Sequence, residues 1–135
     1  MIHNIITDVE DMHSKYKVHS WIAANPDKLA DLMKLRMRML NEEFAETMDA
    51  YLQADSEELV DGLIDLVVIA IGTLDIAGVD VNMAWERVHD ANMSKEVGVK
   101  PGRPNKLGLP DLIKPDGWRS PFHEDNLGTL PTTLK

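Results

Sequence analysis

Two long stretches of the chain carry apolar residues at helical spacing, and a short polar break at Ala54-Asp55-Ser56 separates them. In the first stretch, apolar positions recur every three or four residues and form one stripe, made of Leu29, Met33, Met37, Leu40, Phe44, Met48 and Tyr51. The second stretch is apolar nearly all the way round between Leu59 and Ile71. This pattern predicts two long helices, of which the second is normally buried on most of its surface.

Start and stop signals bound these helices and add two shorter ones. Asn25-Pro26-Asp27 is a typical start for the first long helix, which we expect to end near Gln53. Ser56 is expected to cap the second, and Gly78 to end it. Weaker patterns predict an outer helix from Thr7-Asp8 to about Ala23 and a last helix from Val81 to about Ser94. With short links and no strand pattern, the predicted fold class is all-α, a four-helix bundle.

The composition changes after Lys95. Residues 96–135 hold six of the seven prolines and five of the eight glycines, and helical periodicity ends there. We therefore expect a helical domain over residues 1–95 and an irregular C-terminal arm over residues 96–135. The arm is expected to pack on the bundle or to cover its site.

The two long helices have more apolar surface than one small bundle can cover. Leu32, Leu35 and Met39 widen the stripe of the first long helix beyond the reach of one neighbouring helix. We predict that a homo-oligomer buries this surplus, and the sequence leaves open whether it is a dimer or a tetramer.

Composition narrows the class of protein. The chain has 135 residues, a formal net charge of -9 and no cysteine. The negative charge argues against general nucleic-acid binding, and the absence of cysteine excludes a disulfide framework. The longest apolar run is too short to span a membrane, and the first residues lack a basic segment typical of a signal peptide. We expect a soluble cytoplasmic protein with no nucleic-acid or membrane partner.

Acidic residues fall on the otherwise apolar stripes of the two long helices. Glu43 and Glu46 lie one turn apart on the first, and Glu58, Asp61 and Asp65 share a side of the second. Carboxylates in an apolar interior are costly unless a positive charge compensates them. We therefore expect these acids to converge in a dry interior around a hard cation, Mg²⁺ or Mn²⁺. Three roles are open for Asp65: a metal ligand, a residue that holds a metal ligand in position, or a hydrogen-bond acceptor between helices.

The sequence lacks the motifs that mark other kinds of carboxylate and phosphate sites. A di-iron bundle would need Glu-x-x-His on two helices, and the sequence has none. A P-loop, an EF-hand loop and a nucleophile elbow are absent as well. A phosphate ligand would therefore be held through the metal and scattered basic groups.

The acidic spacing resembles a known family. Glu43-x-x-Glu46 followed by Glu58-x-x-Asp61 is similar to the E-x-x-E…E-x-x-D motif of the MazG-like all-α nucleoside triphosphate pyrophosphohydrolases. This superfamily includes dimeric dUTPases, dCTP pyrophosphatases and phosphoribosyl-ATP pyrophosphohydrolase. The later segment from His89 to Lys95 resembles small MazG-like proteins, some of which are phage-encoded. If this protein is phage-encoded, the expected location is the host cytoplasm. The likeness covers residues 7 to 95.

The resemblance implies a Mg²⁺-dependent hydrolysis of (d)NTP to nucleoside monophosphate and pyrophosphate by water attack at the α-phosphorus. It implies that Glu43, Glu46, Glu58 and Asp61 are metal ligands. Glu42 and Glu46 are the catalytic candidates, Glu42 because it could orient or deprotonate the water. Two alternatives remain open: a narrower dUTP or dCTP pyrophosphatase, and a catalytically silent module that binds nucleotides or a partner protein.

Several polar and aromatic residues are candidates for substrate binding. Trp21 and His13, with Tyr16, could wall a base pocket, although helix packing is the commoner role of such residues. Arg36 falls on the apolar side of its helix, where it could pair with an acid. The candidates for contact with sugar or phosphate are His89, Asn92, Lys95, Lys100 and Arg103, with Lys106 nearby. The alternative is that these residues belong to an ordinary helix C-terminus and a solvated loop and bind no substrate.

Overall fold

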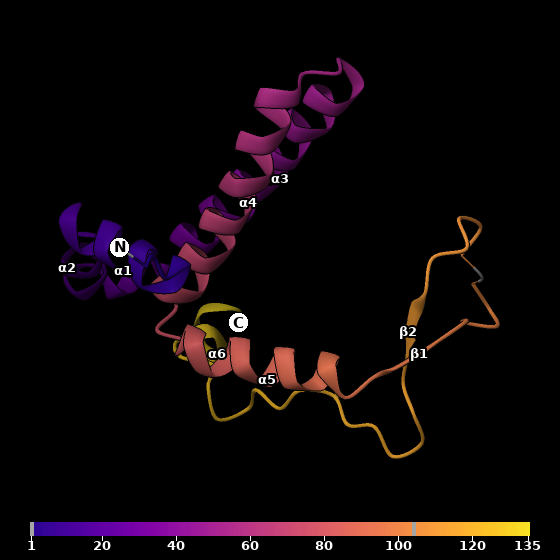
Figure 1. Ribbon diagram of the computed structural model, residues 1–135. Coiled ribbons are helices and arrows are strands. Elements are labelled where there is room, and N and C mark those ends of the chain that lie inside the picture. The colour runs from indigo at the N-terminus through magenta and orange to yellow at the C-terminus, as the bar shows by residue number, and fades with distance from the viewer. Residues whose placement is uncertain (1, 104) are drawn as a thin grey trace. The chain divides into compact units, whose positions relative to one another are not determined.

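The computed structural model describes residues 2–103 and 105–135 and is mostly helical (Figure 1). The prediction of an all-α fold is confirmed. The elements in chain order are α1 (Ile5–Lys15), α2 (Val18–Ala24), the 3₁₀ helix η1 (Pro26–Lys28), α3 (Leu29–Leu52), α4 (Ser56–Ile76), α5 (Val81–Met93), β1 (Glu96–Gly98), β2 (Asp111–Ile113) and α6 (Leu130–Thr133). They group into two compact units, residues 1–81 with 127–135 and residues 82–126. The predicted division at residue 95 stays a prediction.

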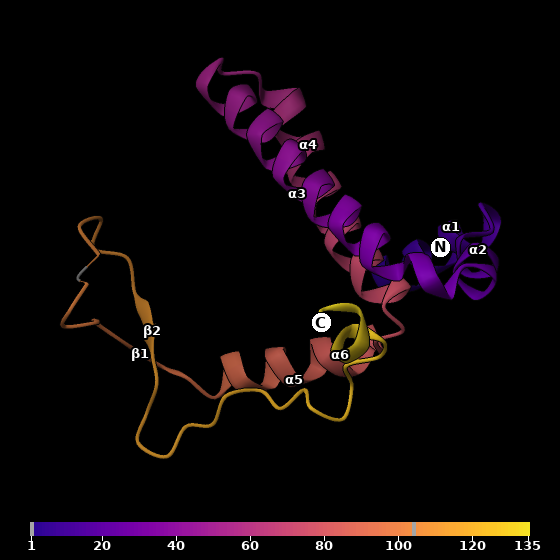
Figure 2. The ribbon, with the colours of Figure 1, turned by 180° about the vertical axis from the view of Figure 1, so that it is seen from behind.

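The α3–α4 hairpin is the centre of the first unit (Figures 1 and 2). Ala54 adopts a left-handed conformation in the connection, and the Asp55 side chain caps α4 by accepting from the Glu58 N–H at 3.1 Å. Asp55 thus takes the capping role predicted for Ser56. The helices approach closely at Gly62, where an added Cβ would collide with the Thr47 hydroxyl. Glycine at this position therefore sets how near the acidic turns of α3 and α4 can lie.

The predicted first helix is two helices in the structure, which corrects the sequence expectation. Asn4, and not Thr7-Asp8, caps α1 by accepting from the N–H groups of Ile6 and Thr7. The chain then breaks at Lys17, which has a φ of 59°. No Gly or Pro marks this break, so the residue pattern did not reveal it. The break allows both α1 and α2 to pack on the end of α4 that lies away from the α3–α4 connection (Figure 1).

The C-terminal residues return to the end of α4. The Thr129 N–H donates to the Ala77 carbonyl at 2.8 Å, and Gly128, with a φ of 55°, lies against the same carbonyl. Any side chain at Gly128 would meet this backbone oxygen. The short helix α6 then packs on α3.

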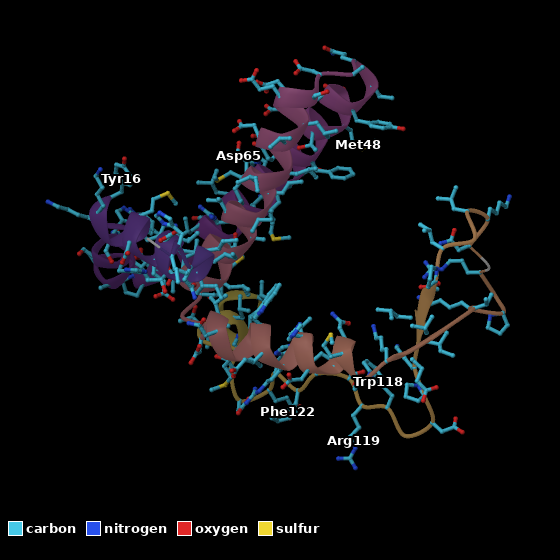
Figure 3. The ribbon with its side chains drawn as sticks, in the orientation of Figure 1. Tyr16, Met48, Asp65, Trp118, Arg119 and Phe122 are labelled. Atoms are coloured by element: carbon cyan, nitrogen blue, oxygen red, sulfur yellow. The ribbon has the colours of Figure 1, made fainter. Side chains whose placement is uncertain are left out.

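The second unit contains α5 and most of the predicted arm. The arm includes a two-stranded sheet that the sequence pattern did not predict. β1 and β2 pair antiparallel, with Val97 opposite Leu112. The Trp118 indole N–H donates to the Ala91 carbonyl at 2.9 Å, and Arg87 pairs with Asp125 through both terminal nitrogens. In Figure 3, Trp118 and Phe122 lie along α5 while Arg119 points away from it. These contacts fix the chain after β2 along α5.

Large apolar side chains on the α3–α4 hairpin remain exposed in the single chain. They are Leu35, Met37, Phe44, Met48, Tyr51 and Leu52 on α3, and Val60, Leu63, Ile64 and Val67 on α4. An exposed apolar surface of this extent is typical of an interface. Within the described residues, no helix has the length and apolar character needed to cross a membrane.

Candidate functional site

The five acids that the sequence singled out lie together on the α3–α4 hairpin. Glu43 and Glu46 come from α3, and Glu58, Asp61 and Asp65 come from α4. Figure 3 shows side-chain oxygens gathered on the side of the hairpin that carries Asp65, opposite Met48. The two helices run antiparallel around a tight connection, so acids close to the connection on each helix face the same side. We call these five residues the acidic face.

Partial burial and repulsion within the acidic face raise the pKa of Glu43 above its usual value. Partial burial is the largest cause, followed by the charges of Asp65, Glu46, Asp61 and Glu58. Each of the other four acids therefore acts on the Glu43 carboxyl. Within the described part of the chain, none of the five carboxylates forms an ion pair or accepts a side-chain hydrogen bond. The acidic face thus carries concentrated negative charge, and no cation among the described residues pairs with it.

The prediction of a dry interior is wrong for the single chain. Glu43 and Asp65 are half-buried, whereas Glu46, Glu58 and Asp61 are exposed, as is Glu42. The reason is that α1 and α2 pack at the other end of the hairpin. Water therefore reaches most of the acids. Partial burial of Glu43 and repulsion among the five carboxylates are the two effects that a bound cation would offset.

The carboxylates have the donor chemistry of a Mg²⁺ site. Oxygen ligands from carboxylates are what hard divalent cations bind. The oxygens of the acidic face lie farther apart than the ligand atoms of a closed metal site. A second cluster of side chains, elsewhere in the first unit, is more compact. Among the described residues, only His13, His19 and Asp75 bring three ligand atoms within 4.8 Å of one another. The acidic face is thus not a closed set of ligands in the single chain, and a cation bound there would need further ligands from water or substrate.

A cavity of about 540 Å³ adjoins the acidic face. Glu58 and Asp61 line it together with Glu57, Val60 and Ile64. The cavity thus combines carboxylates with exposed apolar side chains of α4. It provides room beside the acids for a ligand that has both charged and apolar parts.

A second cavity, of about 790 Å³, lies where α2 meets α3. It is mainly apolar, and Tyr16, Trp21, Leu32 and Leu35 are among the residues that line it. Leu32 and Leu35 share their side of α3 with Glu43 and Glu46, because eleven residues make just over three full turns. Leu35 and Glu43 are about 12 Å apart along the helix axis. We call this the aromatic cavity.

His13 and Arg36 make contacts other than those predicted. His13 is buried and does not line the aromatic cavity; its Nδ1 lies 2.6 Å from an oxygen of Asp75. Arg36 does not pair with an acid in the described structure. Its Nε donates to the Thr73 hydroxyl and its Nη2 to the Ile69 carbonyl, and burial lowers its pKa.

The remaining candidates belong to the second unit. His89 stacks on Trp85 with a centroid distance of 6.5 Å. Lys95 donates to the Asn92 side chain at 3.1 Å and lies over the Trp118 ring. Lys100 pairs with Asp111 at 3.5 Å, while Arg103 and Lys106 are exposed. The structure thus brings Asn92 and Lys95 together, and their role toward a substrate stays a prediction.

Comparison with known families bears directly on the acidic face. A family model described as phosphoribosyl-ATP pyrophosphohydrolase matches residues 18–92, which is more than half of the chain and includes all five acids. The chain belongs to the phosphoribosyl-ATP pyrophosphohydrolase family. Searches of curated proteins and of solved structures gave no match. Membership agrees with the predicted superfamily and identifies the chain as a pyrophosphohydrolase-type hydrolase.

Sequence reasoning missed Asp75 and His19. Asp75 is the one acid in the last two turns of α4, and His19 follows His13 by six residues. Residues six apart lie on different faces of a continuous helix. The prediction of one continuous first helix therefore gave no sign that His13 and His19 come together. The break at Lys17 is what brings both rings to Asp75.

Proposed function

We propose that this pyrophosphohydrolase hydrolyses (d)NTP to (d)NMP and pyrophosphate with Mg²⁺ bound at the acidic face. The observation that carries the proposal is the set of five carboxylates without an ion pair among the described residues, four of them at family-motif spacing, in a chain that belongs to this family. Glu43, Glu46, Glu58 and Asp61 are the proposed ligands, and Asp65 joins or supports them. Mn²⁺ would suit the same oxygens.

The proposed reaction breaks one phosphoanhydride bond. Bound Mg²⁺ neutralises charge on phosphate oxygens and lowers the pKa of a coordinated water. The water oxygen attacks the α-phosphorus, the bond from this phosphorus to the bridging oxygen breaks, and pyrophosphate leaves. Glu42, exposed beside Glu43, is the proposed acceptor of the water proton, and Glu46 holds its place as a ligand.

The base is proposed to occupy the aromatic cavity. This cavity and the acidic face lie on one side of α3, at a separation that an extended nucleoside triphosphate can span. Trp21 offers a ring for stacking, and Lys28 lines the same cavity. The predicted contact of Lys95 and Arg103 with phosphate oxygens stays a prediction.

Incubation with each NTP, each dNTP and phosphoribosyl-ATP, in the presence of Mg²⁺, tests the proposal. We expect pyrophosphate and a nucleoside monophosphate in equal amounts from one or more (d)NTPs. Turnover of dUTP or dCTP alone would establish the narrower pyrophosphatase. Stepwise release of orthophosphate, or turnover of none of these compounds, would contradict the proposal.

Replacing Trp21 by Ala is expected to raise KM by roughly tenfold while kcat changes little. Stacking of a base on an aromatic ring contributes about 1–3 kcal/mol, and this contact is made in the ground state and the transition state alike. Steady-state kinetics on the preferred substrate measure the effect. An unchanged KM would show that the base binds elsewhere.

The raised pKa of Glu43 predicts how the metal-free protein responds to pH. A carboxyl that binds its proton more tightly when folded destabilises the folded state as pH rises from the ordinary pKa through the raised one. Glu43→Gln should therefore stabilise the metal-free protein at pH 7, by roughly 0.2–0.5 kcal/mol for the like-charge pair with Glu46 on the same helix. Near pH 3, where the carboxyl is protonated, the substitution should have no such effect.

Thermal unfolding with and without Mg²⁺ checks this prediction. Mg²⁺ should raise the Tm of the wild type, since a ligand of the folded state stabilises it, and should raise that of Glu43→Gln less. A silent binding module with no metal would show no Mg²⁺ effect in either protein. A lower Tm for metal-free Glu43→Gln at pH 7 would contradict the assigned repulsion.

A further inference from the structure

Asp75 links two histidines at the end of the first unit. One of its oxygens lies 2.6 Å from His13 Nδ1 and 2.7 Å from His19 Nε2. The two imidazole rings meet edge to face, with a centroid distance of 5.9 Å. The three side chains come from α1, α2 and α4, so the cluster joins three helices at one point.

The cluster is closed on one side and open on the other. His13 has 4% of its surface exposed and the Asp75 side chain 13%, whereas the His19 side chain is 44% exposed. No Lys or Arg within the described residues pairs with Asp75. Arg36, which approaches His13 in the space above Gly72, donates instead to Thr73 and Ile69. In the part of the chain that the structure describes, two imidazoles are thus the only side-chain partners of this carboxylate.

We propose that His13, His19 and Asp75 form a binding site for a first-row divalent transition metal ion, with Zn²⁺ as its reference ligand. Two imidazole nitrogens and one carboxylate oxygen are a ligand set that Zn²⁺ accepts. The three ligand atoms already lie within 4.8 Å of one another. The ion would take the place of the hydrogen atom between each ring and Asp75, and each neutral imidazole would then carry its proton on the other ring nitrogen, His13 on Nε2 and His19 on Nδ1.

Small movements convert the hydrogen-bonded cluster into a coordination site. Tetrahedral Zn²⁺, with bonds of about 2.0–2.2 Å, separates its ligand atoms by about 3.3 Å. The nitrogen–oxygen distances must therefore open by about 0.6–0.7 Å from the present 2.6 and 2.7 Å. A shift of exposed His19 opens its own distance to Asp75, and a turn of the Asp75 carboxylate opens the distance to His13, which stays packed. The open side then leaves a fourth position for water.

This site is distinct from the acidic face in position and in chemistry. Asp75 lies ten residues beyond Asp65, about 15 Å along α4. Its imidazole ligands favour Zn²⁺ and similar ions, whereas the acidic face offers oxygen alone and suits Mg²⁺. A bound ion would tie α2, which carries Trp21, to the end of α4. Its role is to hold one wall of the aromatic cavity.

Calorimetric titration of the full chain with Zn²⁺, in excess Mg²⁺ to occupy the acidic face, tests the proposal. We expect one Zn²⁺ per chain, and affinity at least tenfold weaker in His19→Ala, because outer-shell changes alone cost 10–100-fold at metal sites. The matched control is His3→Ala, which removes an exposed histidine bonded to Asp8. It should bind Zn²⁺ as the wild type does.

Co²⁺ provides a second readout that a hydrogen-bonded cluster alone would not give. Bound at the wild-type site, it should show visible absorption of a nitrogen-ligated ion of low coordination number, and His19→Ala should lose this absorption. Circular dichroism of His19→Ala checks that its helices persist. Absence of stoichiometric Zn²⁺ binding in the wild type, or equal affinity in folded His19→Ala, would overturn the proposal.

Discussion

Replacing Asp61 by Asn, or Glu46 by Gln, should lower kcat/KM by about 10²–10³-fold while the helical content stays unchanged. Each substitution removes one proposed metal ligand and leaves a side chain of the same size. Charge stabilisation by a bound cation is worth several kcal/mol in the transition state, and each 1.4 kcal/mol corresponds to a factor of ten. Both residues are exposed, so neither change disturbs packing.

Asp49→Asn is the matched control for these variants. Asp49 is exposed on α3 like Glu46, but it is not among the residues whose charge acts on Glu43. It should retain nearly full activity and the wild-type response to Mg²⁺. Full activity in Asp61→Asn or Glu46→Gln would mean that other residues hold the metal.

The double variant Phe44→Ser, Met48→Ser should convert a homo-oligomer into monomers at micromolar concentration. Phe44 and Met48 lie one turn apart on α3 and are exposed in the single chain. The substitutions should therefore cost the isolated chain little. In an oligomer that buries this stripe, loss of an aromatic anchor costs about 2 kcal/mol or more, which weakens association by roughly 30-fold.

Sedimentation velocity of the wild type and the variant measures this effect. Ile5→Ser is the control, because Ile5 on α1 is exposed to the same extent as Phe44, 56%. It should sediment as the wild type does. A wild type that is monomeric and well folded at micromolar concentration would contradict the proposed assembly.

Helix type and extent were largely predictable because they depend on local signals. The Asn25-Pro26 start is seen in η1 and α3, and Gly78, with a φ of 75°, follows the end of α4 as expected. The break at Lys17 was not predictable. A left-handed lysine has no residue signature, and what it achieves is a contact with Asp75, far away in sequence.

The sequence predicted which residues form the candidate site, but not how exposed those residues are. Helical spacing put Glu43, Glu46, Glu58, Asp61 and Asp65 on adjoining sides of two helices, and the hairpin brings their charges together. Their burial was misjudged, because apolar neighbours on a helix were taken to mean a covered face. In the single chain, large apolar side chains beside the acids are themselves exposed, Leu35 and Ile64 among them. Burial depends on partners that one chain's pattern does not describe.

Arg36 illustrates a further limit. Its position on the apolar side of α3 was evident, but the pattern could not tell a salt bridge from hydrogen bonds to neutral groups. The structure gives it Thr73 and Ile69, both on α4. A buried guanidinium can be satisfied by carbonyl and hydroxyl oxygens, so position alone does not name its partner.

Hydrolysis of the preferred (d)NTP in ¹⁸O-labelled water, with Mg²⁺ present, tests the central claim most directly. Attack of water at the α-phosphorus places the label in the nucleoside monophosphate and none in the pyrophosphate, and mass spectrometry separates the two. The label should vanish from the monophosphate when Mg²⁺ is removed or Asp61 is replaced by Asn. Label in pyrophosphate or orthophosphate, or label in the monophosphate without Mg²⁺, would contradict water attack at a metal held by the acidic face.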